Sequence, residues 1–232
     1  MSFRVPALFA LPAIALAVIF IVLGFLWWPF YLLALPAAAA VVTLLWWRAD
    51  DAAIASLNAR GAGEIEGQRF RNALEALCLR VGLEQPALMV VDSDATNLAA
   101  ISIRRNTLVA TSTLLAKLDA MQTEGVVAHA IMKLMPPKPR YQALVASAPW
   151  AMVGLQKRLA RRWDEVEDGV VQYDLAGVEL TRYPPGLRSA LELLDDSTTE
   201  VMGGEHLGTT WLVPPHAERT PISHRVEVLG EL

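Results

Sequence analysis

The sequence predicts a mostly helical α+β domain that follows an N-terminal hairpin of two transmembrane helices. The chain has 232 residues and is 54% hydrophobic, and no charged residue occurs from Val5 to Trp47. Short apolar runs bounded by turn residues follow between residues 87 and 111, which is typical of a small sheet. The next stretch, Asp119–Met135, has the pattern of a buried helix, and Pro136 ends it because proline cannot continue a helix.

The uncharged N-terminal run is long enough for two short membrane spans, since one span needs about 20 apolar residues. The break is expected near Trp27–Tyr31, because aromatic residues favour the membrane interface and proline suits a turn. We expect spans at 7–27 and 31–47, so residues 1–49 form an anchor with an arginine at each outer end on the cytoplasmic side. A cleaved signal peptide is the alternative, with small residues at 37–40, but the apolar run continues past them.

Residues 50–232 have the patterns of a second, cytoplasmic domain. The spacing of Phe70, Leu74, Leu77 and Val81 predicts an amphipathic helix over residues 64–81. Strands are expected at 87–91, 97–103 and 107–111, the last two joined by a turn, and further helices at 112–118, 169–181, 187–194 and 223–229.

The buried helix between these elements carries the candidate site. Asp119 and Gln122 form a capping box at its start, and His129 and Lys133 lie four residues apart on one face. Two histidines at this spacing bind zinc in H-E-x-x-H helices, where the glutamate is the general base. Here Ala130 cannot accept a proton and the Lys133 ammonium repels a metal ion. Taken alone, a single histidine of this kind is most often a packed core residue.

Charge and cysteine content limit the partners of the chain. Seven basic residues and no acidic one occur between 133 and 162, around an apolar stretch at 141–155. Basic flanks suit the interface beside anionic lipid, so 139–158 is a candidate membrane-contacting segment. The alternative is a buried core helix with a solvated basic end. A net charge of −4 gives no global attraction to nucleic acid, and a single cysteine excludes an intramolecular disulfide.

Several short fragments occur in a specific order along the chain. They are Asn97-Leu98-Ala99, Thr111–Leu115, Val127–His129, Asp174 with Gly177–Thr181, Tyr183–Leu187, and Thr220-Pro221 with Arg225-Val226. In this order they resemble the HtpX-type membrane zinc metallopeptidases, relatives of the CAAX prenyl proteases, over about residues 64–232 together with the hairpin. The resemblance implies a gluzincin-like metallopeptidase fold with a small sheet, placed in the bacterial inner membrane with the main domain in the cytoplasm.

The chain departs from that family at the zinc site. The vestigial positions are His129, Ala130, Lys133, Val170 and Asp174. His129 matches the first zinc histidine, whereas the second histidine and the third ligand, a glutamate, are replaced by Lys133 and Val170. A changed register could recruit Glu167, but a catalytic zinc needs three protein ligands. The sequence therefore predicts no catalytic residue and no bound cofactor, although active relatives use zinc.

These departures predict a catalytically inactive homologue, a pseudoprotease, that binds or regulates membrane-associated proteins, with the lipid bilayer and a membrane protein or peptide segment as partners. The resemblance implies that a substrate strand pairs beside the zinc helix, so Asn97, Leu98 and Ala99 form a candidate peptide-binding edge. We expect Lys133 to balance nearby acids, first of all Asp174. The alternatives are a zinc metalloendopeptidase with an aberrant site and a structural subunit of a membrane complex.

Overall fold

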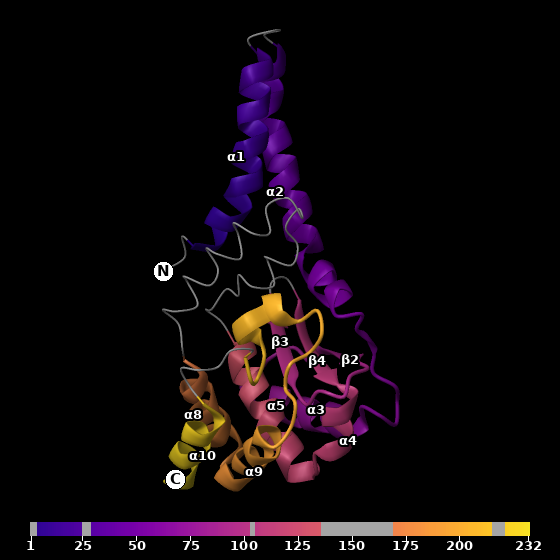
Figure 1. Ribbon diagram of the computed structural model, residues 1–232, viewed down its shortest axis with the longest axis vertical. Coiled ribbons are helices and arrows are strands. Elements are labelled where there is room, and N and C mark those ends of the chain that lie inside the picture. The colour runs from indigo at the N-terminus through magenta and orange to yellow at the C-terminus, as the bar shows by residue number, and fades with distance from the viewer. Residues whose placement is uncertain (1–3, 25–28, 103–104, 136–168, 215–220) are drawn as a thin grey trace.

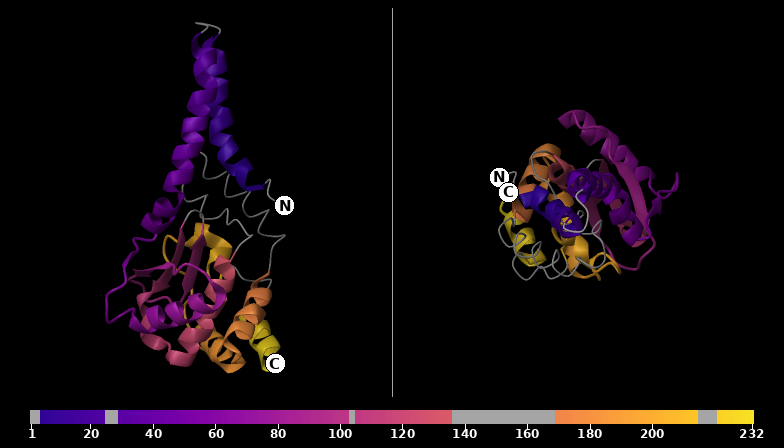
Figure 2. Two further views of the ribbon diagram at one scale, coloured as in Figure 1. Left: turned by 180° about the vertical axis from the view of Figure 1, so that it is seen from behind. Right: turned by 90° about the horizontal axis from the view of Figure 1, so that it is seen from above.

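The computed structural model describes residues 4–24, 29–102, 105–135, 169–214 and 221–232. Its first two helices, α1 (Arg4–Gly24) and α2 (Pro29–Ser56), pack side by side as a hairpin. The hairpin stands away from the other elements, which gather beyond the C-terminal end of α2 (Figure 1). The view from behind shows the same separation (Figure 2). The candidate site therefore belongs to the part of the chain that follows the hairpin.

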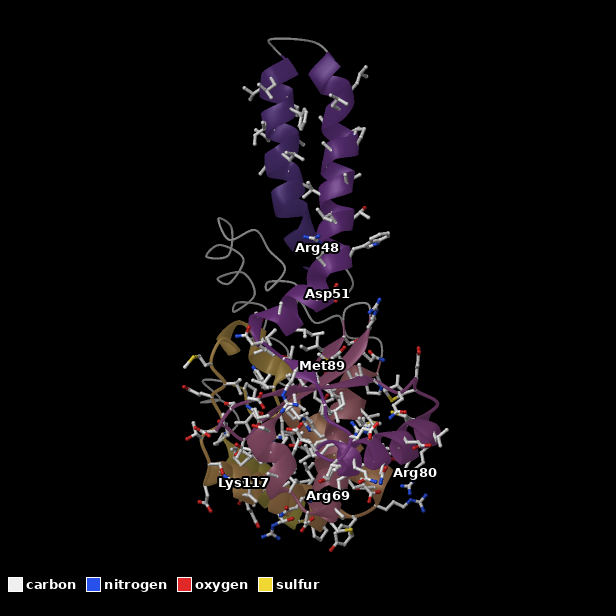
Figure 3. The ribbon with its side chains drawn as sticks, turned by 90° about the vertical axis from the view of Figure 1, so that its right-hand side faces the viewer. Arg48, Asp51, Arg69, Arg80, Met89 and Lys117 are labelled. Atoms are coloured by element: carbon white, nitrogen blue, oxygen red, sulfur yellow. The ribbon has the colours of Figure 1, made fainter. Side chains whose placement is uncertain are left out.

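The predicted transmembrane hairpin is wrong. In the described ranges, no helix is both long enough and apolar enough to cross a membrane. The uncharged run is divided between α1 and α2, Pro36 lies inside α2, and Arg48 and Asp51 lie on the last turns of α2 (Figure 3). The integral-membrane localisation is corrected with it. The boundary after residue 49 stays a prediction, and the candidate membrane-contacting segment 139–158 lies outside the described residues.

A four-stranded mixed sheet follows the hairpin in the chain. Its strands are β1 (Arg60–Gly61), β2 (Ala87–Val91), β3 (Leu98–Ser102) and β4 (Asn106–Thr111), in the order β1-β2-β4-β3. β2 runs parallel to β4, and the other neighbours are antiparallel. The three predicted strands are confirmed to within one residue at each end. β1 was not predicted, because two exposed residues carry no hydrophobic pattern.

Helices account for most of the rest of the domain. They are α3 (Gln68–Val81), α4 (Ser112–Lys117), α5 (Ala120–Leu134), α8 (Val170–Thr181), α9 (Pro184–Asp195), the 3₁₀ helix η2 (Glu205–Thr210) and α10 (Ile222–Gly230). α5 is central, because it packs against α3 and β3 and also against α8 and α9. Its predicted capping box is confirmed: Asp119 Oδ1 accepts from Gln122 N at 2.8 Å, and Gln122 Oε1 accepts from Asp119 N at 3.1 Å. The prediction of a mostly helical domain with a small sheet is thus confirmed.

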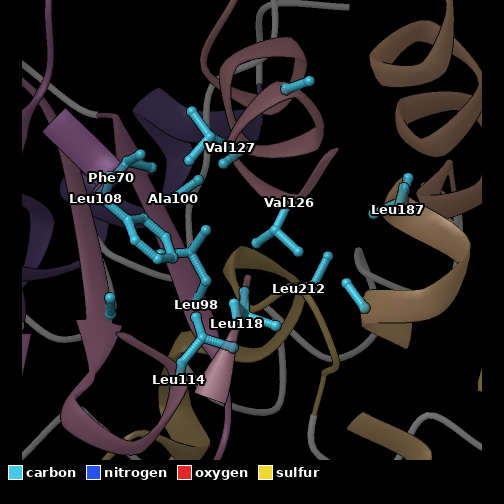
Figure 4. Close-up of a cluster of buried hydrophobic side chains, with 14 of the residues drawn as sticks. Phe70, Leu98, Ala100, Leu108, Leu114, Leu118, Val126, Val127, Leu187 and Leu212 are labelled. Atoms are coloured by element: carbon cyan, nitrogen blue, oxygen red, sulfur yellow. The ribbon is translucent and has the colours of Figure 1, made fainter. Parts of the chain in front are cut away.

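The main core joins the sheet to the helices around α5. Leu98 of β3, Val126 of α5 and Leu187 of α9 are fully buried in one cluster (Figure 4). Two glycines allow the helices to approach closely. A Cβ atom at Gly125 would lie 2.5 Å from the Leu187 amide nitrogen, and one at Gly177 would lie 2.9 Å from the His129 amide nitrogen. The backbones of α8 and α9 therefore rest directly on α5.

Candidate functional site

The site lies on the face of α5 that carries His129 and Lys133. The two residues are one helical turn apart, and their side chains are buried, with 1% and 3% of their surface exposed. A buried ammonium group and a buried imidazole both need polar partners, because removing them from water is costly. The partners come from α8, from α10 and from the segment after η2.

Asp174 on α8 is the partner of His129. Gly177 lets α8 lie against the backbone of His129, and Asp174 is one turn earlier on the same helix. Asp174 Oδ1 lies 2.7 Å from His129 Nδ1. Burial lowers the pKa of His129 to about 4, although the Asp174 carboxylate raises it, so the imidazole is neutral at pH 7. Nδ1–H therefore donates to the carboxylate, which leaves Nε2 as an acceptor.

Arg225 on α10 completes the environment of Asp174. Its Nε donates to Oδ2 at 2.7 Å and its Nη2 donates to Oδ1 at 2.8 Å, a bidentate pair in which both side chains are 1% exposed. Burial alone would raise the pKa of Asp174, but His129 and Arg225 lower it to about 2. The carboxylate is therefore ionised and links three elements, α5, α8 and α10.

Lys133 extends this network toward the sheet. Its Nζ donates to the backbone carbonyl of Trp211 at 2.5 Å. Arg225 Nη1 donates to the next carbonyl, that of Leu212, at 2.8 Å. The two cations thus hold consecutive carbonyl groups of the segment that follows η2. Tyr173 lies with its ring edge-on to His129, at a centroid distance of 6.0 Å.

The segment that these cations hold covers the outer edge of β3. We call residues Trp211–Val213 the internal strand. Leu212 N donates to the carbonyl of Leu98 at 2.7 Å, and Ala99 pairs with Trp211 in an antiparallel bridge. Asn97 Nδ2 donates to the Val213 carbonyl at 2.8 Å, and Asn97 Oδ1 accepts from Val213 N at 3.2 Å. The predicted peptide-binding edge therefore has a strand of the same chain on it.

Two other sequence-predicted positions that the structure describes contribute no polar group to the site. Ala130 and Val170 are buried, with 2% and 5% of their surface exposed. Neither side chain has an atom that could bind a metal or take up a proton. Glu167 and Thr220 lie outside the described residues.

One feature of His129 is typical of a metal ligand. Its Nδ1 is fixed by a carboxylate, and its buried Nε2 has no hydrogen-bond partner among the described residues. A catalytic zinc ion nevertheless needs three protein ligands. Over the described ranges, no three His, Cys, Asp or Glu side chains come together in a way that could hold a metal. The described residues therefore do not fit a catalytic zinc ion.

Two parts of this site were missed in the sequence. Arg225 was noted only as part of a family-like fragment, yet a buried aspartate requires a cation, so an arginine late in the chain was a usable signal. The role of Trp211 had no such signal, because it acts through its backbone carbonyl and every residue has one.

The comparisons with known proteins find a partial similarity to two curated proteins. No family model matches the sequence. Two curated relatives, both called Protease HtpX homolog and from the strains ATCC 25285 and YCH46 of Bacteroides fragilis, are each 32% identical to it over 77 residues. The match covers 32% of this chain, and the chain spans only about a quarter (24%) of the length of these relatives. No solved structure matches.

Proposed function

We propose that the chain is a metallopeptidase-like domain that has lost zinc-dependent proteolysis and acts by binding an extended segment of a protein or peptide. The observation that carries this proposal is the hydrogen bond between Lys133 and the Trp211 carbonyl. It occupies the face of α5 where the HtpX-type resemblance expects the second zinc histidine, one turn after His129.

The chemistry of the site supports binding over hydrolysis. Hydrolysis by a zinc peptidase requires a metal-bound water and a general base beside it. At the position of the base, Ala130 supplies only a methyl group. The ammonium group of Lys133 adds positive charge next to His129 and so disfavours a metal cation there. What remains at the site includes two cationic side chains, Lys133 and Arg225, that donate to backbone carbonyls.

The position of β3 supports an extended segment as the ligand. β3 is the last strand in the described sheet, and the edge of a sheet can bind another strand through main-chain hydrogen bonds. Asn97 at the start of this edge presents both a donor and an acceptor to a neighbouring backbone. Side-chain amides used in this way bind the peptide groups of an extended chain, so the Asn97 amide by itself does not select the side chains of the ligand.

A gain-of-function variant tests the loss of the zinc site. The triple substitution Ala130→Glu, Lys133→His and Val170→Glu introduces the general base and the two zinc ligands that the HtpX-type family has at these positions. We expect it to bind about one zinc ion per chain and to cleave an unfolded protein substrate, whereas the unmodified chain does neither. Adding His129→Ala to the triple variant is the matched control and should abolish zinc binding. Cleavage by the unmodified chain at a rate similar to that of the triple variant would overturn the proposal.

A zinc endopeptidase with an aberrant site is the second candidate function. The observation that favours it is the Asp174-oriented His129, whose buried Nε2 has no hydrogen-bond partner in the described part of the chain. This candidate requires two further ligands from residues outside the described ranges, such as Glu167. Zinc-dependent cleavage that is lost in both Glu167→Gln and His129→Ala would support it.

A further inference from the structure

The internal strand is bound to β3 in the way that a separate peptide would be bound. Strand addition uses main-chain hydrogen bonds along a sheet edge. Leu212 N donates to the Leu98 carbonyl, and the strand runs antiparallel to β3 at Ala99. Asn97 pairs with both polar groups of Val213, as a neighbouring backbone would. The edge that the proposed function assigns to a ligand thus has an occupant from the same chain.

Lys133 fixes the position of that occupant. Its buried ammonium donates to the Trp211 carbonyl, and a hydrogen bond from a charged donor is stronger than one between neutral groups. The Trp211 ring is 1% exposed, and its Nε1 donates to the Gly204 carbonyl at 2.9 Å. Separate parts of the site therefore bind the side chain and the carbonyl group of Trp211.

The attachment of the internal strand to the sheet is short. Its pairing with β3 is an isolated bridge and not a continuous ladder. Gly208 precedes it in a backbone conformation, φ 42° and ψ −116°, that favours glycine, and Pro214 follows it and has no amide hydrogen to pair. The strand is therefore followed directly by a residue that cannot donate to a neighbouring strand, and the 3₁₀ helix before it is interrupted at Gly208.

We infer that Trp211–Val213 is an internal ligand that closes the peptide site in the resting chain, and that partners are extended segments with an aromatic residue followed by two aliphatic residues. Such a partner displaces the internal strand and takes over its bonds to Leu98, Asn97 and Lys133. This inference rests on the proposed function, because it assumes that the edge of β3 is the binding site. Beyond the proposed function, it specifies the side chains of the partner and identifies the internal strand as a segment that competes with the partner for the same edge.

Hydrogen exchange of the unmodified full chain is the first test. If the strand detaches while the domain stays folded, the amides of Leu212 and Val213 exchange at least about tenfold faster than those of Val127 and Ile131 in α5. A synthetic peptide with the sequence of residues 208–214 serves as the probe of binding in trans. Exchange of Leu212 and Val213 at the α5 rate would overturn the inference, because the strand would then open only when the whole domain unfolds.

A release variant and a locked variant test the competition. Leu212→Pro removes the amide that donates to Leu98, so we expect at least about tenfold tighter binding of the peptide than by the unmodified chain. For the lock, Ala99→Cys and Trp211→Cys are combined with Cys78→Ser. The Cα atoms of paired residues on antiparallel strands lie about 4.5–5.5 Å apart, which is within the range of Cα–Cα distances that a disulfide can span. The oxidised form should not bind the peptide, and its own reduced form is the matched control.

Substitution of Lys133 itself tests its role in binding the peptide. In the Leu212→Pro background, Lys133→Met should weaken peptide binding about tenfold, because the charged donor to the ligand carbonyl is lost. Lys117→Met removes an exposed lysine of α4 and should leave the affinity unchanged. Equal affinities of the two variants would contradict the assignment of Lys133.

The outcomes separate the inference from the proposed function. If folded Leu212→Pro, verified by circular dichroism, binds no peptide, both fail. If it binds the peptide but no more tightly than the unmodified chain, and oxidation of the locked variant changes nothing, only the inference fails. Tight binding by Leu212→Pro and redox-controlled binding by the locked variant support both.

Discussion

At the scale of single residues, Asp174 holds the buried network together. Its two oxygens accept hydrogen bonds from His129 on α5 and from Arg225 on α10, and its side chain is 1% exposed. The guanidinium of Arg225 is equally buried, so its desolvation is compensated mainly by this one carboxylate. The network therefore depends on an ionised group at position 174.

Asp174→Asn tests this dependence. We expect a loss of about 3–5 kcal/mol in the free energy of unfolding, because Arg225 would stay buried opposite a neutral amide. Urea denaturation followed by circular dichroism measures the loss. Asp196→Asn changes an exposed residue at the end of α9 and should alter stability by less than about 0.5 kcal/mol. Equal effects of the two substitutions would show that the network does not stabilise the fold.

The sequence shows part of this network and not the rest. The H-E-x-x-H spacing identifies His129 and Lys133, and the family-like fragment identifies Asp174. We expected Asp174 to be the partner of Lys133, but the hydrogen bonds that Asp174 accepts come from His129 and Arg225, and Lys133 donates to a backbone carbonyl. A backbone carbonyl as the partner of Lys133 could not be predicted from the sequence, because every residue carries one.

At the scale of elements, the contact between α8 and α5 positions the site. Gly177 lies against the backbone of His129, and Asp174 reaches the imidazole because the two helices are close. Helix axes separated by ordinary side chains lie 8–10 Å apart, and glycine at the contact permits a closer approach. The identity of residue 177 therefore affects the charge network, although glycine takes no part in it.

Gly177→Ala should separate the two helices. The added methyl group would lie 2.9 Å from the His129 amide nitrogen, which backbone atoms cannot avoid without a shift of α8. We expect a loss of about 1–3 kcal/mol in the free energy of unfolding, as for other overpacked contacts, and a weaker Asp174–His129 hydrogen bond. Thermal denaturation measures the first effect, and the chemical shift of the His129 ring nitrogens reports the second.

Gly61→Ala is the matched control for this variant. A Cβ atom at Gly61 has no atom within 4 Å. The control should therefore unfold at about the same temperature as the unmodified chain. A Gly177→Ala variant as stable as this control would mean that α8 and α5 tolerate a wider separation than the contact suggests.

The elements themselves were largely predictable, for local reasons. Turn residues and apolar runs identified three strands, and the Asp119 capping box identified the start of α5. The internal strand was not predicted, because three apolar residues in a stretch punctuated by glycine and proline carry no period. Its pairing with β3 joins residues more than a hundred positions apart, which no local pattern records.

For the whole molecule, the hairpin shows that hydrophobic composition alone does not predict a membrane span. The run from Val5 to Trp47 predicted two membrane spans, but hydropathy along a sequence takes no account of where helices begin and end. The described helices do not meet the length and apolarity of a span. The mostly helical domain with a small mixed sheet, in contrast, follows from patterns that extend over several elements and reinforce one another.

We propose that the site of the folded chain does not hold a catalytic zinc ion. The most direct test is to purify the full chain without chelator, to measure zinc per chain by atomic emission, and to record the melting temperature with and without added zinc. We expect far less than one zinc ion per chain and no change in melting temperature. About one zinc ion per chain, lost in His129→Ala, would contradict it and support a metallopeptidase with ligands from outside the described residues.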